Sequence, residues 1–241
     1  MLRSADEILS YKLQAGDGQL GKVKDIYFDD ESWVIRYFVA DTRRWLPGRK
    51  VLLFPHLVGE PDWFARLIPV ELTREQIENA PSADEESPVS EEHEAALARY
   101  YLWQPGTAPP RGYPVIPPPP PAEARERDPE ESHLRSLREV TGYRIRAADG
   151  EIGHVEDLVA DTDGWILRYI VVDTRNWLPG GKKVLIAPAW IESVDWSVRQ
   201  VKVELRQDQV CESPPFDPAA PVNREVETRL YDYYGRPRYW L

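Results

Sequence analysis

Short apolar runs separated by turn-forming residues make up most of this chain. In its first third, turn signals rich in Gly, Pro, Asp and Ser recur about every ten residues, at positions 16–18, 29–32, 47–48 and 59–62. The runs between them, such as WVIRYFVADT and VLLFP, are rich in the β-branched and aromatic residues that favour strands. From Val34 to Asp41 both alternating faces carry apolar residues, which is typical of a strand covered on both sides. Strands this short at this spacing predict a small barrel or sandwich.

Helix signals are fewer and follow the strand-rich regions. Thr73, with Gln76 three residues later, has the form of a capping box, which predicts a short helical turn. Residues 90–101 and 223–234 have amphipathic patterns, with Ser90 and Asn223 as their N-cap residues. Each strand-rich region is therefore expected to be followed by an amphipathic helix.

The chain repeats itself. Residues 2–48 align with residues 134–180 without a gap, and about half of the positions are identical. After one extra glycine, Gly181, the match continues, with VLLFP opposite VLIAP. It also includes the helices, because SPVSEEHEAALARYY aligns with APVNREVETRLYDYY. The duplicated unit is thus a strand-rich module together with a helix.

Composition divides the chain further. The segment between the two copies is rich in proline and charged residues, which favours an extended spacer. We therefore predict a mainly β protein with two small β-barrels in tandem, each of about five or six strands and each followed by an α-helix. The expected boundaries are 1–80 for the first module, 81–103 for its helix, 104–133 for the proline-rich acidic linker, 134–213 for the second module, and 214–241 for the C-terminal helix and aromatic tail.

Charge and cysteine content narrow the function classes. Of the formal net charge of −11, residues 81–133 carry −7, so both modules are close to neutral. A near-neutral module without a basic stripe argues against nucleic acid as a direct partner, except through the ribosome. The single cysteine, Cys211, excludes a disulfide framework. The N-terminal residues do not form a signal peptide, and no apolar run is long enough to span a membrane. A soluble, cytoplasmic protein without membrane insertion is expected.

Three motifs occur in both copies: an opening D-G-x-[LI]-G-x-V-x-D, a strand W-x-x-R-Y-x-V-x-D-T, and a closing V-x-L. Together they resemble the PRC-barrel family, over residues 1–80 and 134–213. That domain is similar to the cytoplasmic domain of the photosynthetic reaction centre H subunit and to the C-terminal domain of the ribosome maturation factor. The C-terminal segment resembles that of stand-alone bacterial members with two such units. The resemblance implies the fold and a role in protein interaction, but no catalytic activity. A membrane-anchoring helix like that of the H subunit and an N-terminal domain like that of the ribosome factor are not found in the sequence, so neither function carries over intact.

The most distinctive phrase in both copies is DTR-x-WLPG, at 41–48 and 173–180. An Asp that ends a strand can accept hydrogen bonds from the backbone of the following turn, and Pro-Gly sets the geometry of that turn. Duplication of a structural corner follows from duplication of the module, so the structural interpretation is preferred. A binding interpretation stays open, since Arg43 and Arg175, beside Trp45 and Trp177, can hold an acidic or planar partner.

Other candidate chemistry has simpler explanations. GDGQLG and ADGEIG lack the spacing of phosphate-binding loops and are better explained as hairpin turns with Asp-Gly at the corner. The acidic residues 29–31 lack the ligand spacing of a Ca²⁺ loop, so they are interpreted as a solvated turn. No two of the four histidines have metal-ligand spacing. The sequence therefore predicts no catalytic residue, no metal site and no cofactor.

The C-terminal YDYYGRPRYWL is the most aromatic stretch of the chain. Its aromatic side chains are expected to dock on the chain's own modules or across a homodimer, because a fully exposed cluster is an adhesive surface. The alternative is an anchor for another protein, through Tyr233, Tyr234, Tyr239 and Trp240. The function expected from the sequence is a non-enzymatic scaffold or protein-interaction module whose partner is another protein. The alternative is a ribosome- or RNA-associated assembly factor.

Overall fold

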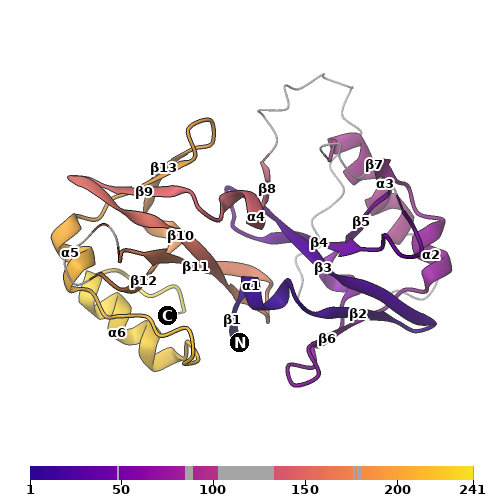
Figure 1. Cartoon of the computed structure of the whole chain (residues 1–241), viewed down its shortest axis with the longest axis horizontal. Helices are drawn as coiled ribbons and strands as arrows, with labels where there is room; N and C mark the ends of the chain where they lie inside the picture. Colours follow the sequence, from indigo (N-terminus) through magenta and orange to yellow (C-terminus); the bar gives the residue numbers. More distant parts are fainter. Residues whose placement is uncertain (48, 85–88, 103–132, 176, 178–180, 241) are drawn as a thin grey trace. The chain divides into compact units, whose positions relative to one another are not determined.

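The computed structural model describes residues 1–47, 49–84, 89–102, 133–175, 177 and 181–240. Figure 1 shows the chain coloured along the sequence from the N-terminus to the C-terminus. Of the linker expected at 104–133, only His133 falls within these residues. The chain forms two compact units. Unit 1 comprises Met1–Glu7 and Ser136–Leu241, and unit 2 comprises Ile8–Arg135.

Unit 2 is built on a mainly antiparallel sheet in the order β6-β2-β3-β4-β5-β7, and β8 also pairs with β3. The parallel pair is β2 with β6. The strands are β2 (Lys12–Ala15), β3 (Gly18–Asp29), β4 (Ile35–Asp41), β5 (Arg49–Leu53), β6 (Leu67–Val70), β7 (Ala83–Asp84) and β8 (Leu134–Ser136). The helices are α2 (Arg74–Glu78) and α3 (Glu91–Leu102), with the 3₁₀ turn η1 (Pro55–Leu57).

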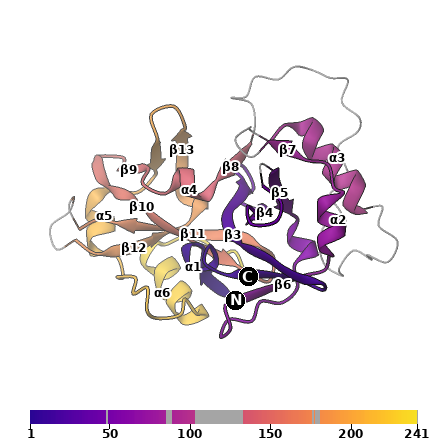
Figure 2. The ribbon, with the colours of Figure 1, turned by 45° about the vertical axis from the view of Figure 1, so that its right-hand side comes forward.

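Unit 1 repeats five strands of this order, β14-β9-β10-β11-β12 matching β6-β2-β3-β4-β5, but its additional strand β13 pairs with β14, whereas β7 pairs with β5. Its sheet has the order β12-β11-β10-β9-β14-β13, with β1 paired to β10, and its parallel pair is β9 with β14. The strands are β1 (Leu2–Ser4), β9 (Arg144–Ala147), β10 (Gly150–Asp161), β11 (Ile166–Asp173), β12 (Lys183–Ile186), β13 (Ile191–Asp195) and β14 (Gln200–Val203). The helices are α1 (Ala5–Ile8), α4 (Leu137–Val140), α5 (Gln207–Glu212) and α6 (Arg224–Tyr234), with the 3₁₀ turn η3 (Pro188–Trp190). Figure 2 shows α6 beside β11 and β12.

The protein is thus mainly β, as predicted. Its strands form two sheets where two barrels were expected, and neither sheet closes by continuous strand pairing within the described residues. The reason lies in the residues that follow β5. Pro55 begins η1 and cannot donate a backbone hydrogen bond, so the chain leaves the ladder there. It meets β6 again at the isolated bridges Val58↔Val70 and Asp62↔Leu67 rather than in a continuous ladder. Pro188 begins η3 in the same way, before β13.

The predicted hairpins and caps are confirmed. The two Asp-Gly turns join β2 to β3 and β9 to β10. Thr73 and Gln76 form the capping box of α2, and Asn223 caps α6 by accepting from Val226 N. Ser90 Oγ accepts from His93 N at 3.2 Å, as expected for the cap of α3.

The strand predicted to be covered on both sides is β4, and both of its faces are buried. Tyr37 is 1 % exposed on one face and Phe38 is 0 % exposed on the other. The equivalent residues of β11, Tyr169 and Ile170, are both fully buried. These side chains form the centre of each core, so each unit has the apolar interior needed to hold its surface residues in place.

The compact units do not follow the sequence repeats. β1 precedes the first repeat's other strands but pairs with β10, in the register Leu2↔Asp161, Arg3↔Ala160 and Ser4↔Val159. Conversely, β8 opens the second repeat but pairs with β3 of the first. Each repeat therefore gives its first strand to the sheet of the other.

Candidate partner-binding site

The strand-ending aspartates hold the turn that follows them, as the sequence predicted. Asp173 accepts from Arg175 N at 2.9 Å, and its two carboxylate oxygens accept from the Arg175 guanidinium. In the first copy Arg43 Nε and Nη2 donate to Asp41 at 2.9 and 2.8 Å. The arginines are therefore fixed close to the corner while their side chains stay more than half exposed.

These ion pairs predict an acid-sensitive contribution to stability. Hydrogen bonds from Arg175 lower the pKa of Asp173 from 3.8 to about 2. Because the folded-state pKa lies below the unfolded one, the stabilisation is complete above about pH 4 and is lost as pH falls towards 2. We expect Arg175→Gln to reduce the free energy of unfolding at pH 7 and to have little effect at pH 2. Urea unfolding at both values measures this, and an effect of equal size at both would contradict the assignment.

The two corner tryptophans differ in exposure. Trp45 is half-buried: its Nε1 donates to Leu20 O at 2.8 Å, and the Arg74 guanidinium lies 4.5 Å from the centre of its ring. At the position equivalent to Arg74 the second copy has Gln207, which donates instead to Glu151 O. Trp177 is 38 % exposed. The first corner is therefore tied to the sheet, whereas the second presents an aromatic surface beside Arg175.

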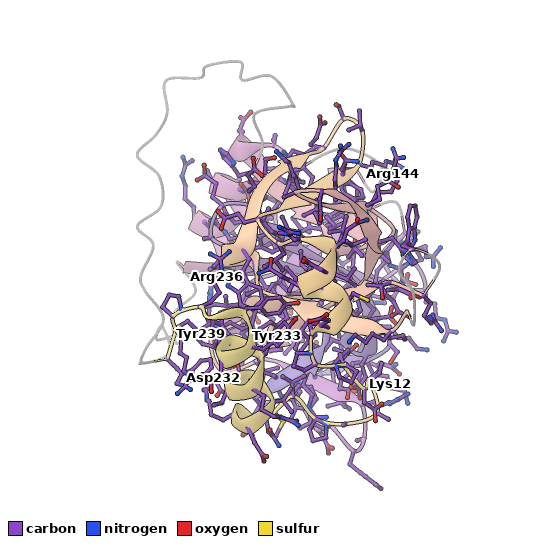
Figure 3. All side chains as sticks on the ribbon, turned by 90° about the vertical axis from the view of Figure 1, so that its left-hand side faces the viewer. Lys12, Arg144, Asp232, Tyr233, Arg236 and Tyr239 are labelled. Carbon is purple, nitrogen blue, oxygen red and sulfur yellow. The ribbon has the colours of Figure 1, made fainter. Side chains whose placement is uncertain are left out.

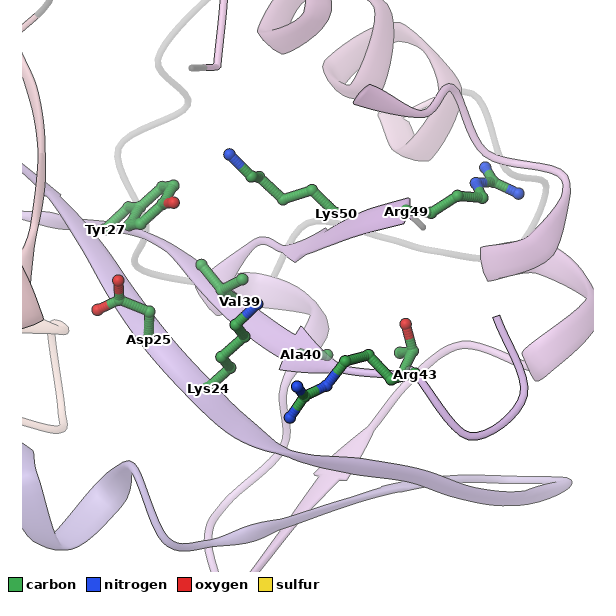
Figure 4. A pocket seen from close by; sticks show the side chains of 9 residues that line it. Lys24, Asp25, Tyr27, Val39, Ala40, Arg43, Arg49 and Lys50 are labelled. Atoms are coloured by element: carbon green, nitrogen blue, oxygen red, sulfur yellow. The ribbon is translucent and has the colours of Figure 1, made fainter. Parts of the chain in front are cut away.

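A surface depression lies next to the first corner, between β3, β4 and β5 (Figure 4). It is lined by Lys24, Asp25, Tyr27, Val39, Ala40, Thr42, Arg43, Arg49 and Lys50. Four of these side chains are cationic and one is a carboxylate. Arg49 is anchored because it donates to the carbonyls of Glu78 and Ala80, both at 2.6 Å. This surface is suited to an anionic group.

The second copy keeps the frame of this surface but reverses its charge at one position. Lys182, equivalent to Arg49, donates to Ser213 O, as Arg49 donates to Ala80 O. Glu156 stands where the first copy has Lys24, and its carboxylate is 2.7 Å from Lys183 Nζ. The second copy thus pairs its charges within the sheet. Sequence reasoning overlooked this difference, although the aligned pair Lys24 and Glu156 carries the signal.

The aromatic tail packs on unit 1. Tyr239 OH donates to Glu227 at 2.7 Å, and the Arg168 guanidinium lies 4.2 Å from the centre of its ring. Trp240 contacts Tyr231 edge-on at 5.1 Å between ring centres. Two ion pairs also hold the tail, Arg238 with Asp232 and Arg236 with Glu204. Asp232, Arg236 and Tyr239 are labelled in Figure 3. These contacts are the cis docking considered from the sequence.

Two other tail residues connect helix α6 to α5 and to η3. Tyr233 OH donates to Gln209 O at 2.8 Å, and the equivalent Tyr100 OH donates to Gln76 O at the same distance. Tyr234 contacts Trp190 at 4.8 Å between ring centres, and burial raises its pKa to about 12. Tyr233 and Tyr239 are still 39 % and 38 % exposed, so part of each ring can contact a partner.

Other sequence candidates fall outside this surface. Within the described residues, no three His, Cys, Asp or Glu side chains gather to hold a metal ion. The interpretation of residues 29–31 as a solvated turn is wrong for Asp30, whose side chain is only 8 % exposed. It accepts from Arg135 Nε at 2.8 Å and lies 2.9 Å from His133 Nδ1, which raises the pKa of His133. Asp30 is buried because β8 covers this edge of β3.

Comparison with known proteins identifies a domain in the second half. The PRC-barrel domain model matches residues 133–207, from the residue before β8 to the first residue of α5. A search of curated proteins finds no match to the chain. This second region carries a PRC-barrel domain. In the part of the chain that the structure describes, no helix has the length and apolar character needed to cross a bilayer.

Proposed function

We propose that this chain is a non-enzymatic, soluble, cytoplasmic scaffold or protein-interaction module built from a duplicated PRC-barrel. The partner is another protein, and each unit offers its own candidate contact surface: the basic depression of the first copy and the exposed corner of the second. The first 80 residues are the other PRC-type copy in this proposal, on the strength of the sequence repeat and the shared strand order.

The charge reversal at Lys24 and Glu156 carries the proposal. The two copies share buried strands, corner ion pairs and helix contacts, which are the features that maintain a fold. They differ where the side chains reach solvent, with Lys24 lining a depression in the first copy and Glu156, paired with Lys183, at the equivalent position of the second. Surface divergence on a common frame supports recognition of a partner, because rim charges set partner choice and association rate.

The test is quantitative capture from native lysate with the tagged chain, with and without RNase. We expect one protein to be retained after RNase treatment and Lys24→Glu to reduce its capture at least about tenfold, the effect of a buried or close charge pair worth ~1.4 kcal/mol or more. Lys12→Glu on β2 changes the net charge equally but lies outside the depression, so it is the matched control.

Two further outcomes decide between functions. Equal losses with Lys24→Glu and Lys12→Glu would show a general charge effect and reject the depression as the site. Capture of ribosomal proteins that disappears with RNase would favour the assembly-factor alternative, to which the four cationic side chains also lend support by their attraction to phosphate.

The second corner gives an independent prediction. We expect Trp177→Ala combined with Arg175→Ala to reduce partner capture several-fold, because exposed Trp and Arg side chains dominate interaction energies. The melting temperature of the variant is expected to fall slightly, because Arg175 stabilises the corner through its ion pair with Asp173, so capture is measured well below that temperature. Unchanged capture by the folded variant would remove the second corner from the site.

A further inference from the structure

The exchanged strands β1 and β8 are short and are held by specific side chains. Ser4 Oγ donates to Asp157 Oδ2 at 2.6 Å, and Asp6 N donates to the other oxygen of the same carboxylate at 3.0 Å. Ser4 Oγ also accepts from Glu7 N at 3.0 Å, which begins the helical turn that follows. Directly after β1, Ala5 is fully buried. In unit 1, therefore, the incoming segment is held by β10 and its Asp157.

In unit 2 the incoming segment is β8, and it is held by residues at the end of β3. Arg135 donates to the buried side chain of Asp30, directly after β3, and His133 O accepts from Asp30 N at 2.9 Å. Both donor strands have the sequence Leu-Arg-Ser, and their acceptor strands β10 and β3 occupy the same position in each sheet. The exchange is thus reciprocal and uses the same strand pairing twice.

None of these contacts depends on which chain supplies the donor strand. We propose that a second copy of this chain is a partner at this edge, and that two chains associate by exchanging β1 and β8 between them. An exchanged dimer contains the same ladders, the same Asp157 and Asp30 contacts and the same buried Ala5 as the monomer. Domain exchange of identical elements is a low-cost route to a dimer for this reason.

The balance between monomer and dimer follows from tethering. A donor on the same chain has an effective concentration in the millimolar range. The three-residue ladder Leu2–Ser4 is short enough to open without unfolding the rest of the sheet. The exchanged dimer is therefore expected to be a minor species at micromolar concentration and to increase as the protein concentration approaches the millimolar range. This exchange of strands between two chains is independent of the proposed scaffold function.

The experiment uses cysteine trapping in the full chain, with Cys211→Ser in every variant. Leu2 and Asp161 are directly opposed on β1 and β10, and both are half-buried and accessible to oxidant. Opposed residues of antiparallel strands lie within reach of a disulfide. The double variant Leu2→Cys/Asp161→Cys is expected to form an intramolecular disulfide, and failure to do so would refute the strand pairing and the proposal together.

The decisive mixture contains one chain with Leu2→Cys and another with Asp161→Cys, incubated at about 1 mM and then oxidised. We expect a mixed disulfide dimer to form at least about tenfold faster than in a control mixture of Leu2→Cys with Val198→Cys, because exchange raises the local thiol concentration. Val198 is 53 % exposed in the turn after β13 and measures random collision only. Equal rates in the two mixtures would overturn the proposal.

Discussion

Gly153→Ala is expected to lower the free energy of unfolding of unit 1 by about 2–5 kcal/mol, through overpacking and an unfavourable backbone conformation together. A Cβ atom at this position would lie 2.1 Å from Asp173 O, which belongs to the adjacent strand β11. The backbone φ is also positive, at +151°. Because the colliding atom is a backbone carbonyl, rotation of a side chain cannot relieve the clash.

Two glycines of the same unit separate these contributions. Gly142 has a φ of +91°, but a Cβ there would have nothing within 4 Å, so Gly142→Ala measures the backbone contribution alone, expected at about 1 kcal/mol. Gly164 has only ordinary contacts with Ile166, and its substitution by Ala is expected to stay within about 0.5 kcal/mol of the parent. Urea unfolding of the three variants measures the differences. Equal values for Gly153→Ala and Gly142→Ala would show that the strands separate without penalty.

The same close approach connects the fold to the candidate site. Asp173, whose carbonyl lies over Gly153, is also the residue that fixes Arg175 at the corner. In the first copy a Cβ on Gly21 would lie 1.8 Å from Asp41 O, and Asp41 fixes Arg43. Displacement of either strand would therefore move an arginine of the proposed partner-binding site, and Gly153→Ala should also weaken any capture that depends on Arg175.

These glycines show what the sequence could and could not predict. The Asp-Gly pairs predicted the hairpins because a turn depends on adjacent residues. The second glycine of each motif, Gly21 or Gly153, was visible in the sequence only as an identity between the repeats. A glycine is needed there because a backbone carbonyl of the adjacent strand lies too close for a Cβ atom. The structural interpretation of the corner was likewise accessible from Asp41, Pro47 and the duplication, but the cover of Trp45 by Arg74 depends on residues far apart in sequence.

The exchange of first strands between the two repeats could not be predicted from the sequence, for a physical reason. Both repeats begin with Leu-Arg-Ser, and both acceptor strands have similar apolar patterns. Pairing within a repeat and pairing between repeats therefore satisfy the same local preferences. Asp30 illustrates the consequence: beside Asp29 and Glu31 it has the composition of an exposed turn, and only the arrival of β8 buries it.

The candidate surface was partly predictable. The sequence singled out the arginines and tryptophans of the two corners because a distinctive phrase occurs twice. It did not bring Lys24 and Lys50 together, because they lie on β3 and β5 and meet only when β4 pairs between them. The aromatic tail was identified from the sequence. Which of its side chains are packed and which are exposed depends on contacts with Arg168 and Trp190, which the sequence does not show.

Glu227→Ala is expected to cost unit 1 about 3–5 kcal/mol, the range for removing one partner of a buried charged network. Glu227 is 2 % exposed, and its Oε1 accepts from both Tyr169 OH and Tyr239 OH at 2.7 Å. Its Oε2 is 2.9 Å from Arg224 Nη1. Removing the carboxylate leaves the hydroxyl of the fully buried Tyr169 without this acceptor and removes one of the contacts that hold α6 and the tail in unit 1.

Glu227→Gln is the matched control, because its amide oxygen can still accept from both hydroxyls. The control loses only the pairing with the half-exposed Arg224, which we expect to cost about 1 kcal/mol. A double-mutant cycle of Tyr169→Phe with Glu227→Ala, measured by urea unfolding, should give a coupling energy of about 1–3 kcal/mol for this pair. Additive effects would mean that the hydrogen bond contributes nothing beyond packing.

The same network should also make the stability of the protein depend on pH in the alkaline range. Burial, together with the hydrogen bond and charge of Glu227, raises the pKa of Tyr169 above its ordinary value of 10. Because the folded-state pKa is the higher one, the stabilisation is complete below pH 10 and is lost progressively as pH rises above it and the unfolded tyrosine ionises. The equivalent Tyr37 in unit 2 also has a raised pKa, with burial and Glu94 as its causes. Both units are therefore expected to lose stability above pH 10. Tyr169→Phe should reduce this dependence in unit 1 without abolishing it, because burial also raises the pKa of Tyr234 in the same unit to about 12. An unchanged alkaline slope in that variant would assign the dependence to the other tyrosines.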